Sequence, residues 1–389
     1  MDNFVFHSPT KVIFGKGEEA NVGGLIKGYG FGKVLLHYGG GSIQKSGLYD
    51  VVTKSLREAG VAFVELSGVE PNPKLPLVRE GIALCRNEGV DIILAVGGGS
   101  VIDSAKAIGM GLPMDADVWD IYSGAFRPTA TVPVGVILTL AAAGSELSNS
   151  SVITNPAQML KRGHGNDVCR PLFAILNPAL TFTVSKFQTA CGVVDILMHT
   201  IERFFGTPAR TELTDALAES LMRTVITAGK KAFENPEDYE ARGDIMWASS
   251  LSHNGLTGNG RTGDWASHQL EHEISGMFDR VAHGAGLSVV FPAWARYVCK
   301  HDYARFARFA VNVWGVIHNG SNEETAHAGI DAAEAFFRSL DMPTRLTDLG
   351  IGAESIEGMA KQAYGARDSF GFFTPIRPED TVAIYKLAL

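Results

Sequence analysis

The first half of the chain alternates short apolar runs with stretches in which apolar residues recur every three to four positions. Three runs are typical of buried strands: residues 33–38 (KVLLHY), 62–66 and 91–96 (DIILAV). A longer apolar run at 132–143 is too short to cross a bilayer and indicates a further buried strand. Strands that are apolar throughout and alternate with helices predict a Rossmann-like parallel α/β sheet covered on both faces.

The second half shows the helical period almost throughout after about residue 185. The clearest predicted helices cover residues 193–205, 213–228, 245–256, 264–278 and 303–316. We therefore expect two domains, an α/β domain over residues 1–185 and an all-α domain over 186–389. A cleft between two such domains is the default place for a small ligand.

Composition narrows the possible partners and location. The 389 residues suit two domains, and the formal net charge of −8 argues against nucleic acid or anionic membrane as a partner. The cysteines lack a CxxC pair, which argues against a disulfide framework and a thiolate zinc site, and the N-terminal segment lacks a signal-peptide pattern. These observations predict a cytoplasmic protein. The cysteines are Cys85, Cys169, Cys191 and Cys299.

Two GGGS turns, at residues 39–42 and 97–100, each follow a predicted strand and precede a helix. Glycine lets the backbone approach a phosphate closely, and free N–H groups at a helix start favour an anion. Ser100 is expected to cap the second helix. Neither turn has the six-residue Rossmann fingerprint, so each alone also fits a tight turn without a ligand. The pair, at carboxyl ends of strands, favours a dinucleotide site.

The first turn also bears on cofactor choice. Sites that prefer NAD often place an acidic residue just after an early strand, where it holds the ribose hydroxyls. This turn has no acid, offers the hydroxyl of Ser42, and is followed by Lys45. Space, a hydroxyl and a positive charge suit a 2′-phosphate, so we expect NADP(H) to be preferred over NAD(H).

A carboxylate and several imidazoles recur at helical spacing in the second half. Asp195 and His199 are four residues apart, as are His268 and His272, and His283 follows. Such a set suits Zn²⁺ or Fe²⁺. Spacing alone leaves open whether these histidines bind a metal or are hydrogen-bonded core residues. The other histidines are expected to be ordinary: His7, His37, His164, His253, His301, His318 and His327.

The motifs together resemble the iron-containing (group III) alcohol dehydrogenases, and most closely their NADP(H)-dependent butanol dehydrogenase and aldehyde reductase branch. The resemblance covers nearly the whole chain. It is carried by HSPTKVIFGKG, LLHYGGGSIQKSGLYD, GVEPNP, LAVGGGSVIDSAKAI, LTLAAAGSE, GVVDILMHTIE, DWASHQLEHEIS and AHGAGLSVVFPAW. It implies an N-terminal α/β dinucleotide-binding domain and a helical metal-binding and substrate domain, the architecture also found in dehydroquinate synthases.

The resemblance implies roles for individual residues. The metal ligands fall on Asp195, His199, His268 and His283. His272 matches a histidine beside the nicotinamide and is assigned a proton relay. The cofactor residues fall on Gly39, Gly40, Gly41, Ser42, Asn72, Gly98, Gly99, Ser100, Asp103, Thr139, Ser148 and Lys161.

Three positions depart from the family pattern. Ala143 stands where relatives often carry threonine, which removes a hydroxyl near the phosphates. His283 lies about one residue further from His268 than in close relatives, with the insertion in the loop FDRVAH. Asn177, before Pro178, replaces a frequent aspartate. We expect these changes to affect affinities rather than the reaction.

The function expected from this resemblance is hydride transfer between NADP(H) and small primary alcohols or aldehydes such as butanol and butanal. A homodimer is also expected. A glycerol-type polyol dehydrogenase is the nearest alternative, although it usually prefers NAD and a different ligand set. A dehydroquinate synthase-like lyase would need a glutamate ligand and a dense lysine and arginine site. A non-catalytic sensor would be favoured if one metal ligand were missing.

Overall fold

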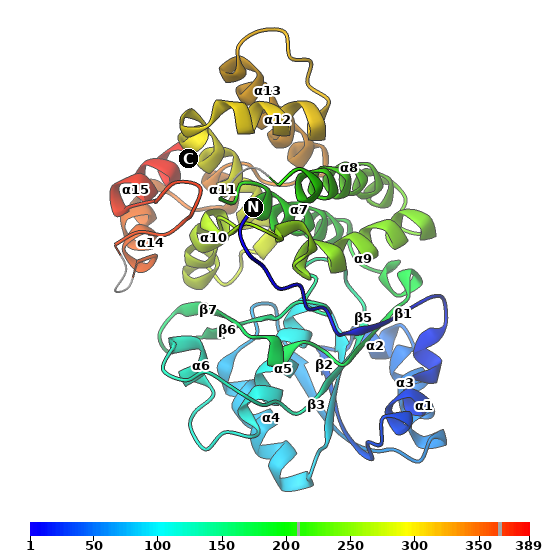
Figure 1. Ribbon diagram of the computed structural model, residues 1–389. Coiled ribbons are helices and arrows are strands. Elements are labelled where there is room, and N and C mark those ends of the chain that lie inside the picture. The colour runs from blue at the N-terminus through cyan, green and yellow to red at the C-terminus, as the bar shows by residue number, and fades with distance from the viewer. Residues whose placement is uncertain (208–210, 365–367) are drawn as a thin grey trace. The chain divides into compact units, whose positions relative to one another are not determined.

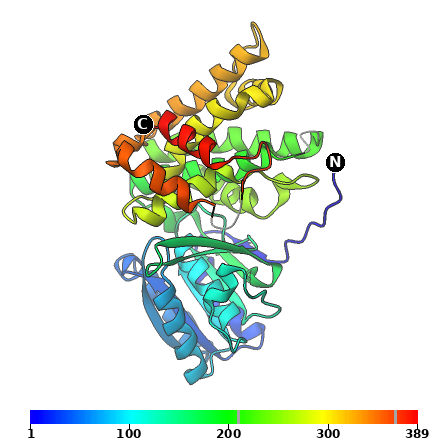
Figure 2. The same cartoon turned by 90° about the vertical axis from the view of Figure 1, so that its left-hand side faces the viewer.

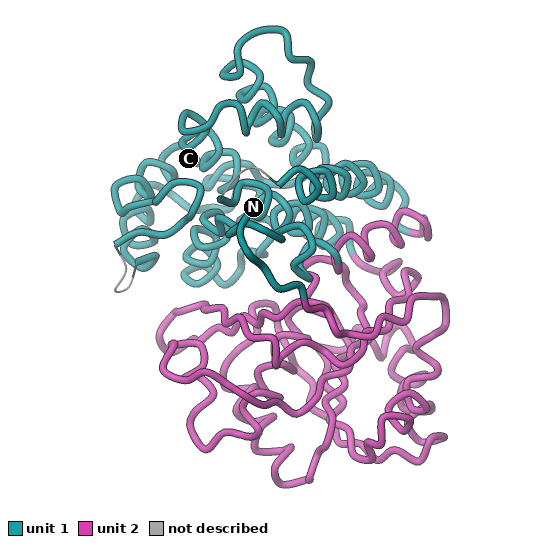
Figure 3. The backbone as a smooth tube through the Cα atoms, in the orientation of Figure 1, with its two compact units in different colours: residues 1–6, 185–236, 251–389 teal, residues 7–184, 237–250 magenta. Residues whose placement is uncertain are grey.

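A computed structural model describes residues 1–207, 211–364 and 368–389. The chain forms two compact units, shown in different colours in Figure 3. One unit contains residues 1–6, 185–236 and 251–389, and the other contains residues 7–184 and 237–250. The assignment of cofactor binding to residues 1–185 and of metal binding to residues 186–389 stays a prediction.

The α/β unit is built on a parallel sheet (Figure 1). Its strands run in the order β1-β8-β5-β4-β2-β3, and all neighbours pair in parallel. A separate antiparallel hairpin pairs β6 with β7. The strands are β1 (Lys11–Phe14), β2 (Lys33–Gly39), β3 (Ala62–Val69), β4 (Ile92–Gly97), β5 (Val134–Leu138), β6 (Ser150–Asn155), β7 (Leu160–Gly165) and β8 (Phe173–Leu176).

Two apolar clusters cover the two faces of this sheet. Figure 2 gives a second view of the unit and its helices. Along β2, Leu35 belongs to one cluster while Val34 and Leu36 belong to the other, because successive side chains point to opposite faces. The α/β prediction with both faces covered is therefore confirmed. The helices of this unit are α1 (Val22–Gly28), α2 (Ser42–Lys45), α3 (Leu48–Glu58), α4 (Leu75–Glu88), α5 (Gly99–Gly111) and α6 (Trp119–Ser123), with short 3-10 turns at Glu18–Asn21, Asp167–Cys169 and Pro178–Thr181.

The strand order places a switch point between β2 and β4. The chain leaves β2 towards β3 on one side, and then returns so that β4 pairs with the opposite edge of β2. Ligands of open α/β sheets bind at the carboxyl ends of the strands where the order reverses. The two GGGS turns begin at these ends, because β2 ends at Gly39 and β4 ends at Gly97.

The other unit is helical, and its described residues contain no β-strand. The five predicted helices are confirmed, with ends shifted by up to seven residues. The unit contains α7 (Lys186–Phe204), α8 (Glu212–Glu234), the end of α9 (Tyr239–His253), α10 (Ala266–Met277), α11 (His283–Val298), α12 (Tyr303–Trp314), α13 (Asn322–Ser339), α14 (Ile356–Gln362) and α15 (Pro378–Leu387), with 3-10 turns at Leu256–Gly258, Cys299–His301, Leu346–Leu349 and Ala353–Ser355.

Two negative observations accompany this architecture. In the described part of the chain, no helix has both the length and the apolar character needed to cross a bilayer. The four cysteines form no disulfide in the described residues.

Candidate metal and cofactor sites

Helix α7 supplies the carboxylate and the first imidazole of the candidate metal site. Ser185 caps the helix by accepting a hydrogen bond from the backbone N–H of Gln188 at 3.2 Å. Asp195 and His199 lie one turn apart in the middle of the helix, and both are buried. Their side chains share a face, and Asp195 Oδ1 lies 3.6 Å from His199 Nδ1.

Helices α10 and α11 supply the other two imidazoles. His268 lies in the first turn of α10, and His283 is the first residue of α11. Nε2 of each ring lies 3.7 Å from Asp195 Oδ1. The structure therefore brings all four predicted metal ligands together around one carboxylate oxygen, including His283 with its longer preceding loop.

The donor atoms at this cluster fit a metal ion. Asp195 Oδ1, His199 Nδ1 and His268 Nε2 are buried and have no hydrogen-bond partner among residues 1–207, 211–364 and 368–389. Buried polar atoms are normally hydrogen-bonded, so three that face one another indicate a missing partner. Ligands about 2.0–2.2 Å from a tetrahedral centre are roughly 3.3–3.6 Å apart, close to the observed separations.

The electrostatics of the cluster also favour a cation. Burial holds the pKa of His199 well below its usual value, and the neighbouring His253 and His268 rings lower it further. Burial would also lower the pKa of His268, but the carboxylates of Asp195 and Glu202 outweigh it and raise the pKa to about 9. His199 thus stays in the neutral form that binds metals, while the carboxylates stabilise positive charge at His268.

Several aromatic side chains lie beside the cluster. His253 was expected to be ordinary, but its ring centroid lies 4.0 Å from that of His199. Trp265 lies 5.3 Å from His268, and the Arg203 guanidinium lies 4.6 Å from the Trp265 ring. Trp265 has the left-handed φ of 63°, which is rare for a bulky residue and marks a constrained turn at the start of α10.

His272 lies next to the cluster but outside the set around Asp195. Its ring centroid is 5.6 Å from that of His283, and the residue is only partly buried. Its assignment as a proton relay stays a prediction.

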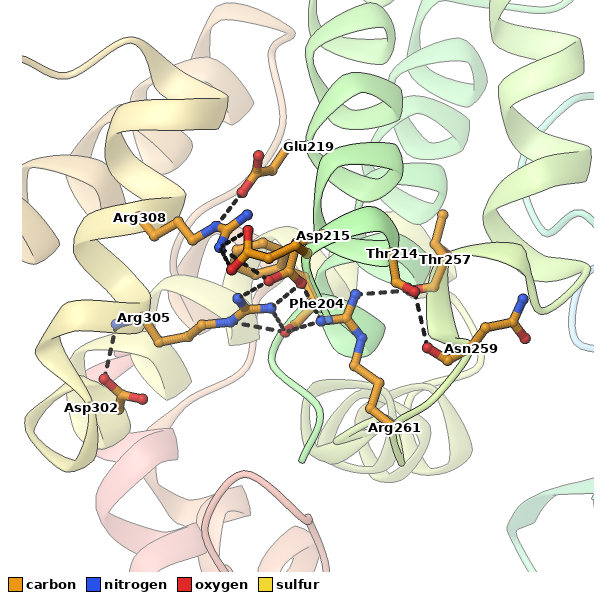
Figure 4. A network of polar contacts seen from close by, with 11 residues as sticks. Phe204, Thr214, Asp215, Glu219, Thr257, Asn259, Arg261, Asp302, Arg305 and Arg308 are labelled. Carbon is orange, nitrogen blue, oxygen red and sulfur yellow. Dashed lines mark hydrogen bonds and ion pairs between the residues drawn. The ribbon is translucent and has the colours of Figure 1, made fainter. Parts of the chain in front are cut away.

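A buried ionic network fixes the end of α7 (Figure 4). The Phe204 carbonyl near the end of the helix accepts hydrogen bonds from Arg305 and Arg261. Asp215 of α8 forms ion pairs with both arginines, including 2.6 Å from Oδ2 to Arg305 Nη1. All three charged side chains are almost completely buried. The network joins α7, α8, α12 and the segment before α10, and so holds the helix that carries Asp195 and His199.

In the α/β unit, the first GGGS turn is open to solvent. Gly40 and Ser42 are exposed, and Gly41 adopts φ 115° immediately before the short helix α2. No acidic residue lies between positions 39 and 49. The turn therefore offers backbone N–H groups and a hydroxyl, but no carboxylate for a ribose diol.

The second GGGS turn packs against the segment that follows β5. Helix α5 begins at Gly99 with Gly98 as its cap residue, so the expectation that Ser100 caps the helix is wrong. A Cβ at Gly99 would come within 2.9 Å of Ala143 Cβ, and one at Gly98 would lie 3.1 Å from Leu140 Cβ. Packing therefore disfavours a side chain at Gly99, and one at Gly98 would require Leu140 to move, whether or not a phosphate also approaches this turn.

Behind this turn lies a buried polar network centred on Lys106, which sequence reasoning missed. Lys106 Nζ donates to the carbonyls of Ser145 (2.6 Å), Ser148 (2.9 Å) and Ser150 (2.9 Å). Asp103 accepts from the Ser145 hydroxyl at 2.5 Å and from the Val152 N–H at 2.9 Å. Both oxygens of Asp103 and the Ser148 hydroxyl therefore already bind protein groups, which gives them a structural role.

The remaining predicted cofactor residues follow the carboxyl ends of strands or line the hairpin. Thr139 comes directly after β5 and is partly buried. Asn72 follows β3, is buried, and has φ 55°. Lys161 is buried on β7. Burial raises the pKa of Asp103, and the charges of Lys106 and Lys161 only partly oppose that shift. The roles assigned to all of these residues stay predictions.

The asparagine that replaces a frequent aspartate has a local explanation. Asn177 Oδ1 accepts the Ala179 N–H at 3.0 Å, and its Nδ2 donates to both carboxylate oxygens of Glu19 at 3.1 and 3.0 Å. An aspartate could not donate to Glu19, so the amide suits this buried partner.

Comparison with known proteins agrees with this architecture. Residues 9–178 match the iron-containing alcohol dehydrogenase family, and residues 189–389 match the C-terminal region of the same Fe-containing family. NADH-dependent butanol dehydrogenase A of Clostridium acetobutylicum is 44% identical over 99% of both chains. NADPH-dependent aldehyde reductase YqhD of Escherichia coli is 36% identical over 93% of both chains.

A solved structure of a butanol dehydrogenase matches the fold of the whole chain. The crystal structure of NADH-dependent butanol dehydrogenase A from Thermotoga maritima matches with a TM-score of 0.96 and 39% identity, covering 100% of this chain and 99% of that one. The resemblance to the iron-containing alcohol dehydrogenase family is confirmed. The chain belongs to the iron-containing alcohol dehydrogenase family, and its enzyme class is that of an alcohol dehydrogenase.

Proposed function

We propose that this enzyme interconverts small primary alcohols and aldehydes, such as butanol and butanal, with NADP(H) as the preferred hydride carrier and one divalent metal ion. The observation that carries the proposal is the convergence of one carboxylate and three imidazoles, with three separations of 3.6–3.7 Å from Asp195 Oδ1. Relatives named as butanol dehydrogenases and as an aldehyde reductase support the substrate class.

Asp195, His199, His268 and His283 are proposed to hold the ion. A nitrogen-rich set with one carboxylate and no thiolate suits Zn²⁺ or Fe²⁺. When bound, the metal supplies a Lewis acid for the substrate oxygen and the nicotinamide supplies or accepts the hydride. His272 is proposed to bind or release the proton at a ring nitrogen as the oxygen changes between carbonyl and hydroxyl. His272 is only partly buried, which suits exchange of that proton with solvent.

The cofactor is proposed to lie at the switch point between β2 and β4, with its phosphates at the GGGS turns. The residues proposed to contact it are Gly39, Gly40, Gly41, Ser42, Asn72, Gly98, Gly99, Ser100, Asp103, Thr139, Ser148 and Lys161. The preference for NADP(H) is supported by the absence of an acid in the first turn and by the exposed Ser42 and Lys45. Relatives named as NADH-dependent and as NADPH-dependent both occur, so the first turn carries this part of the proposal.

Kinetics on metal-stripped protein test the function. We expect butanal-dependent oxidation of NADPH only after anaerobic addition of Fe²⁺ or Zn²⁺, and its loss in a folded His268→Ala variant. His318→Ala, an exposed histidine outside the cluster that contacts Asn322, is the matched control and should keep full activity. Absence of turnover of several aldehydes, with either metal and either reduced cofactor, would refute the proposed function. A clear preference for NADH would refute the cofactor assignment.

We also propose a homodimer in the cytoplasm. The edge strand β1 has no neighbour on its outer side in the described sheet and carries the exposed Phe14, which suits contact with a second copy. Light scattering coupled to gel filtration tests the mass, and a monomer would refute the dimer. The unpaired cysteines fit a reducing compartment, and fractionation of the source cells tests the location.

A further inference from the structure

The two histidines contributed by α10 and α11 each contact a buried glutamate through the ring nitrogen that points away from Asp195. His268 Nδ1 lies 3.1 Å from Glu202 Oε1, and the same oxygen accepts the His268 backbone N–H at 2.9 Å. His283 Nδ1 contacts Glu271 Oε2. The side chains of Glu202 and Glu271 are 1% and 0% exposed, so both carboxylates are shielded from water.

We propose that Glu202 and Glu271 are positioning residues that orient His268 and His283 for metal binding. Each carboxylate accepts a hydrogen bond from Nδ1–H and so keeps the lone pair on Nε2, the atom that faces Asp195 at 3.7 Å. Partners of this kind fix the tautomer and orientation of a ligand and raise its basicity. The inference rests on the proposed metal function, because it assigns these glutamates through the ion that the histidines hold.

The connectivity supports a coordinated arrangement. Glu202 is on α7 and holds a ring on α10, whereas Glu271 is on α10 and holds a ring on α11. Each carboxylate therefore fixes the orientation of a ligand on the next helix. Asp195, His199 and Glu202 follow one another at spacings of four and three residues, so a single stripe of α7 supplies two ligands and a positioning group.

Glu202 and Glu271 are buried close to other carboxylates or to tightly packed backbone, unlike the partners of an exposed ion pair. The Glu202 carbonyl accepts the Asp264 backbone N–H at 2.8 Å, and burial together with the charge of Glu202 raises the pKa of Asp264 to about 7. Glu271 packs closely against Gly286, where a Cβ would come within 2.7 Å of Glu271 Cγ, so the missing side chain at Gly286 makes room for the glutamate. Two buried carboxylates beside a third at Asp195 concentrate negative charge, which a divalent cation would offset.

Glutamine variants test the role, because glutamine keeps the shape of the side chain and removes its charge. We expect Glu202→Gln and Glu271→Gln each to weaken Zn²⁺ binding 10- to 100-fold, measured by competition with a chromophoric chelator. Glu273→Gln is the matched control: Glu273 is a buried carboxylate on α10 that accepts a hydrogen bond from Gln269 on the same helix. In the same chelator competition, the Glu273→Gln variant should keep its Zn²⁺ affinity within about twofold of that of the original protein.

A second measurement separates orientation from stability. In Zn²⁺-loaded protein with ¹⁵N-labelled histidine, two rings of the original protein should show Nδ1–H with Nε2 bound to the metal, and each glutamine variant should alter one of them. Circular dichroism of the metal-free variants provides the folding control, and if one variant fails to fold, the other carries the test.

The outcomes separate the two proposals. Zn²⁺ affinity within twofold of the original protein in a folded Glu202→Gln or Glu271→Gln variant would overturn the positioning role of that residue. An original protein that binds neither Zn²⁺ nor Fe²⁺ would overturn the proposed metal function itself and the positioning role with it.

Discussion

Gly284 of α11 lies directly against Cys191 of α7. A Cβ at position 284 would come 2.3 Å from the Cys191 carbonyl oxygen and 2.6 Å from its Cα, so only glycine fits. Gly284 follows the proposed ligand His283, and Cys191 lies one turn before Asp195. The close approach of these two backbones is therefore what brings His283 within reach of the carboxylate on α7.

Replacing Gly284 by alanine should damage both the packing and the metal site. The methyl group must displace backbone rather than a flexible side chain, so we expect a loss of about 1–3 kcal/mol in the free energy of unfolding. His283 would move with α11, and Zn²⁺ affinity should fall. Denaturant unfolding and metal titration measure the two effects. Gly358→Ala is the control, since its Cβ would make only an ordinary 3.4 Å contact with Met277. Equal behaviour of the two variants would contradict the argument.

The buried network at Asp215 allows a prediction about stability. Asp215→Asn leaves Arg261 and Arg305 buried without their anionic partner, which should cost about 3–5 kcal/mol. Glu212 pairs with Arg308, and the Glu212 side chain is 79% exposed. Glu212→Gln should therefore change stability by less than about 1 kcal/mol. Chemical denaturation of both variants checks this contrast, and a loss below 1 kcal/mol for Asp215→Asn would show that the network is dispensable.

His37 should make stability depend on pH. The ring is fully buried, with Nδ1 2.8 Å from the Leu66 carbonyl oxygen and Nε2 2.8 Å from Ser104 Oγ. Burial lowers its pKa to about 4, while the contact with the Leu66 carbonyl opposes the shift. Because the folded pKa lies below the unfolded value of about 6.5, the contribution is present above pH 6.5 and lost as pH falls towards 4.

The size of this effect is measurable by comparison with His37→Asn. The shift corresponds to about 3 kcal/mol of stability lost between pH 6.5 and pH 4. The stability advantage of the original protein over the variant should therefore shrink by roughly that amount between pH 7.5 and pH 4, as measured by urea unfolding. Parallel stability curves for the two proteins would show that His37 does not titrate in this way.

Much of the fold followed from periodicity, because strands buried on both faces and amphipathic helices leave strong local patterns. The strands at 33–38 and 91–96 and the helices of the second half illustrate this. The hairpin β6–β7 and helix α11 were not among the predicted elements. Helix α11 is buried nearly all round and contains Pro292, so it has no polar face to mark its period.

The sequence predicted the residues that converge on Asp195 in the candidate metal site, but not their surroundings. The proposed ligands lie in motifs that resemble those of the family, whereas the approach of His253 to His199 depends on tertiary packing between segments distant in sequence. Glu202 could have been found from the stripe that it forms with Asp195 and His199. Lys106 could not, because a lysine within an apolar helix gives no indication that it binds the carbonyls of a distant loop.

The cofactor preference can be tested at Gly40. This residue is exposed, and a Cβ built on it meets no atom within 4 Å, so a side chain can be added without strain. An aspartate there would lie in the turn proposed to accept a 2′-phosphate. We expect Gly40→Asp to lower kcat/KM for NADPH by roughly tenfold or more, because placing a carboxylate next to the negatively charged 2′-phosphate costs several kcal/mol. Activity with NADH should stay near its original value or rise.

Gly40→Asn separates charge from size, since asparagine has nearly the same shape as aspartate and is neutral. We expect it to change kcat/KM for either cofactor by less than about threefold, which is under 1 kcal/mol. If asparagine and aspartate reduce NADPH use equally, the effect is steric and the 2′-phosphate does not lie at this turn. If aspartate weakens NADPH use while asparagine does not, the missing acid at positions 39–42 accounts for the preference.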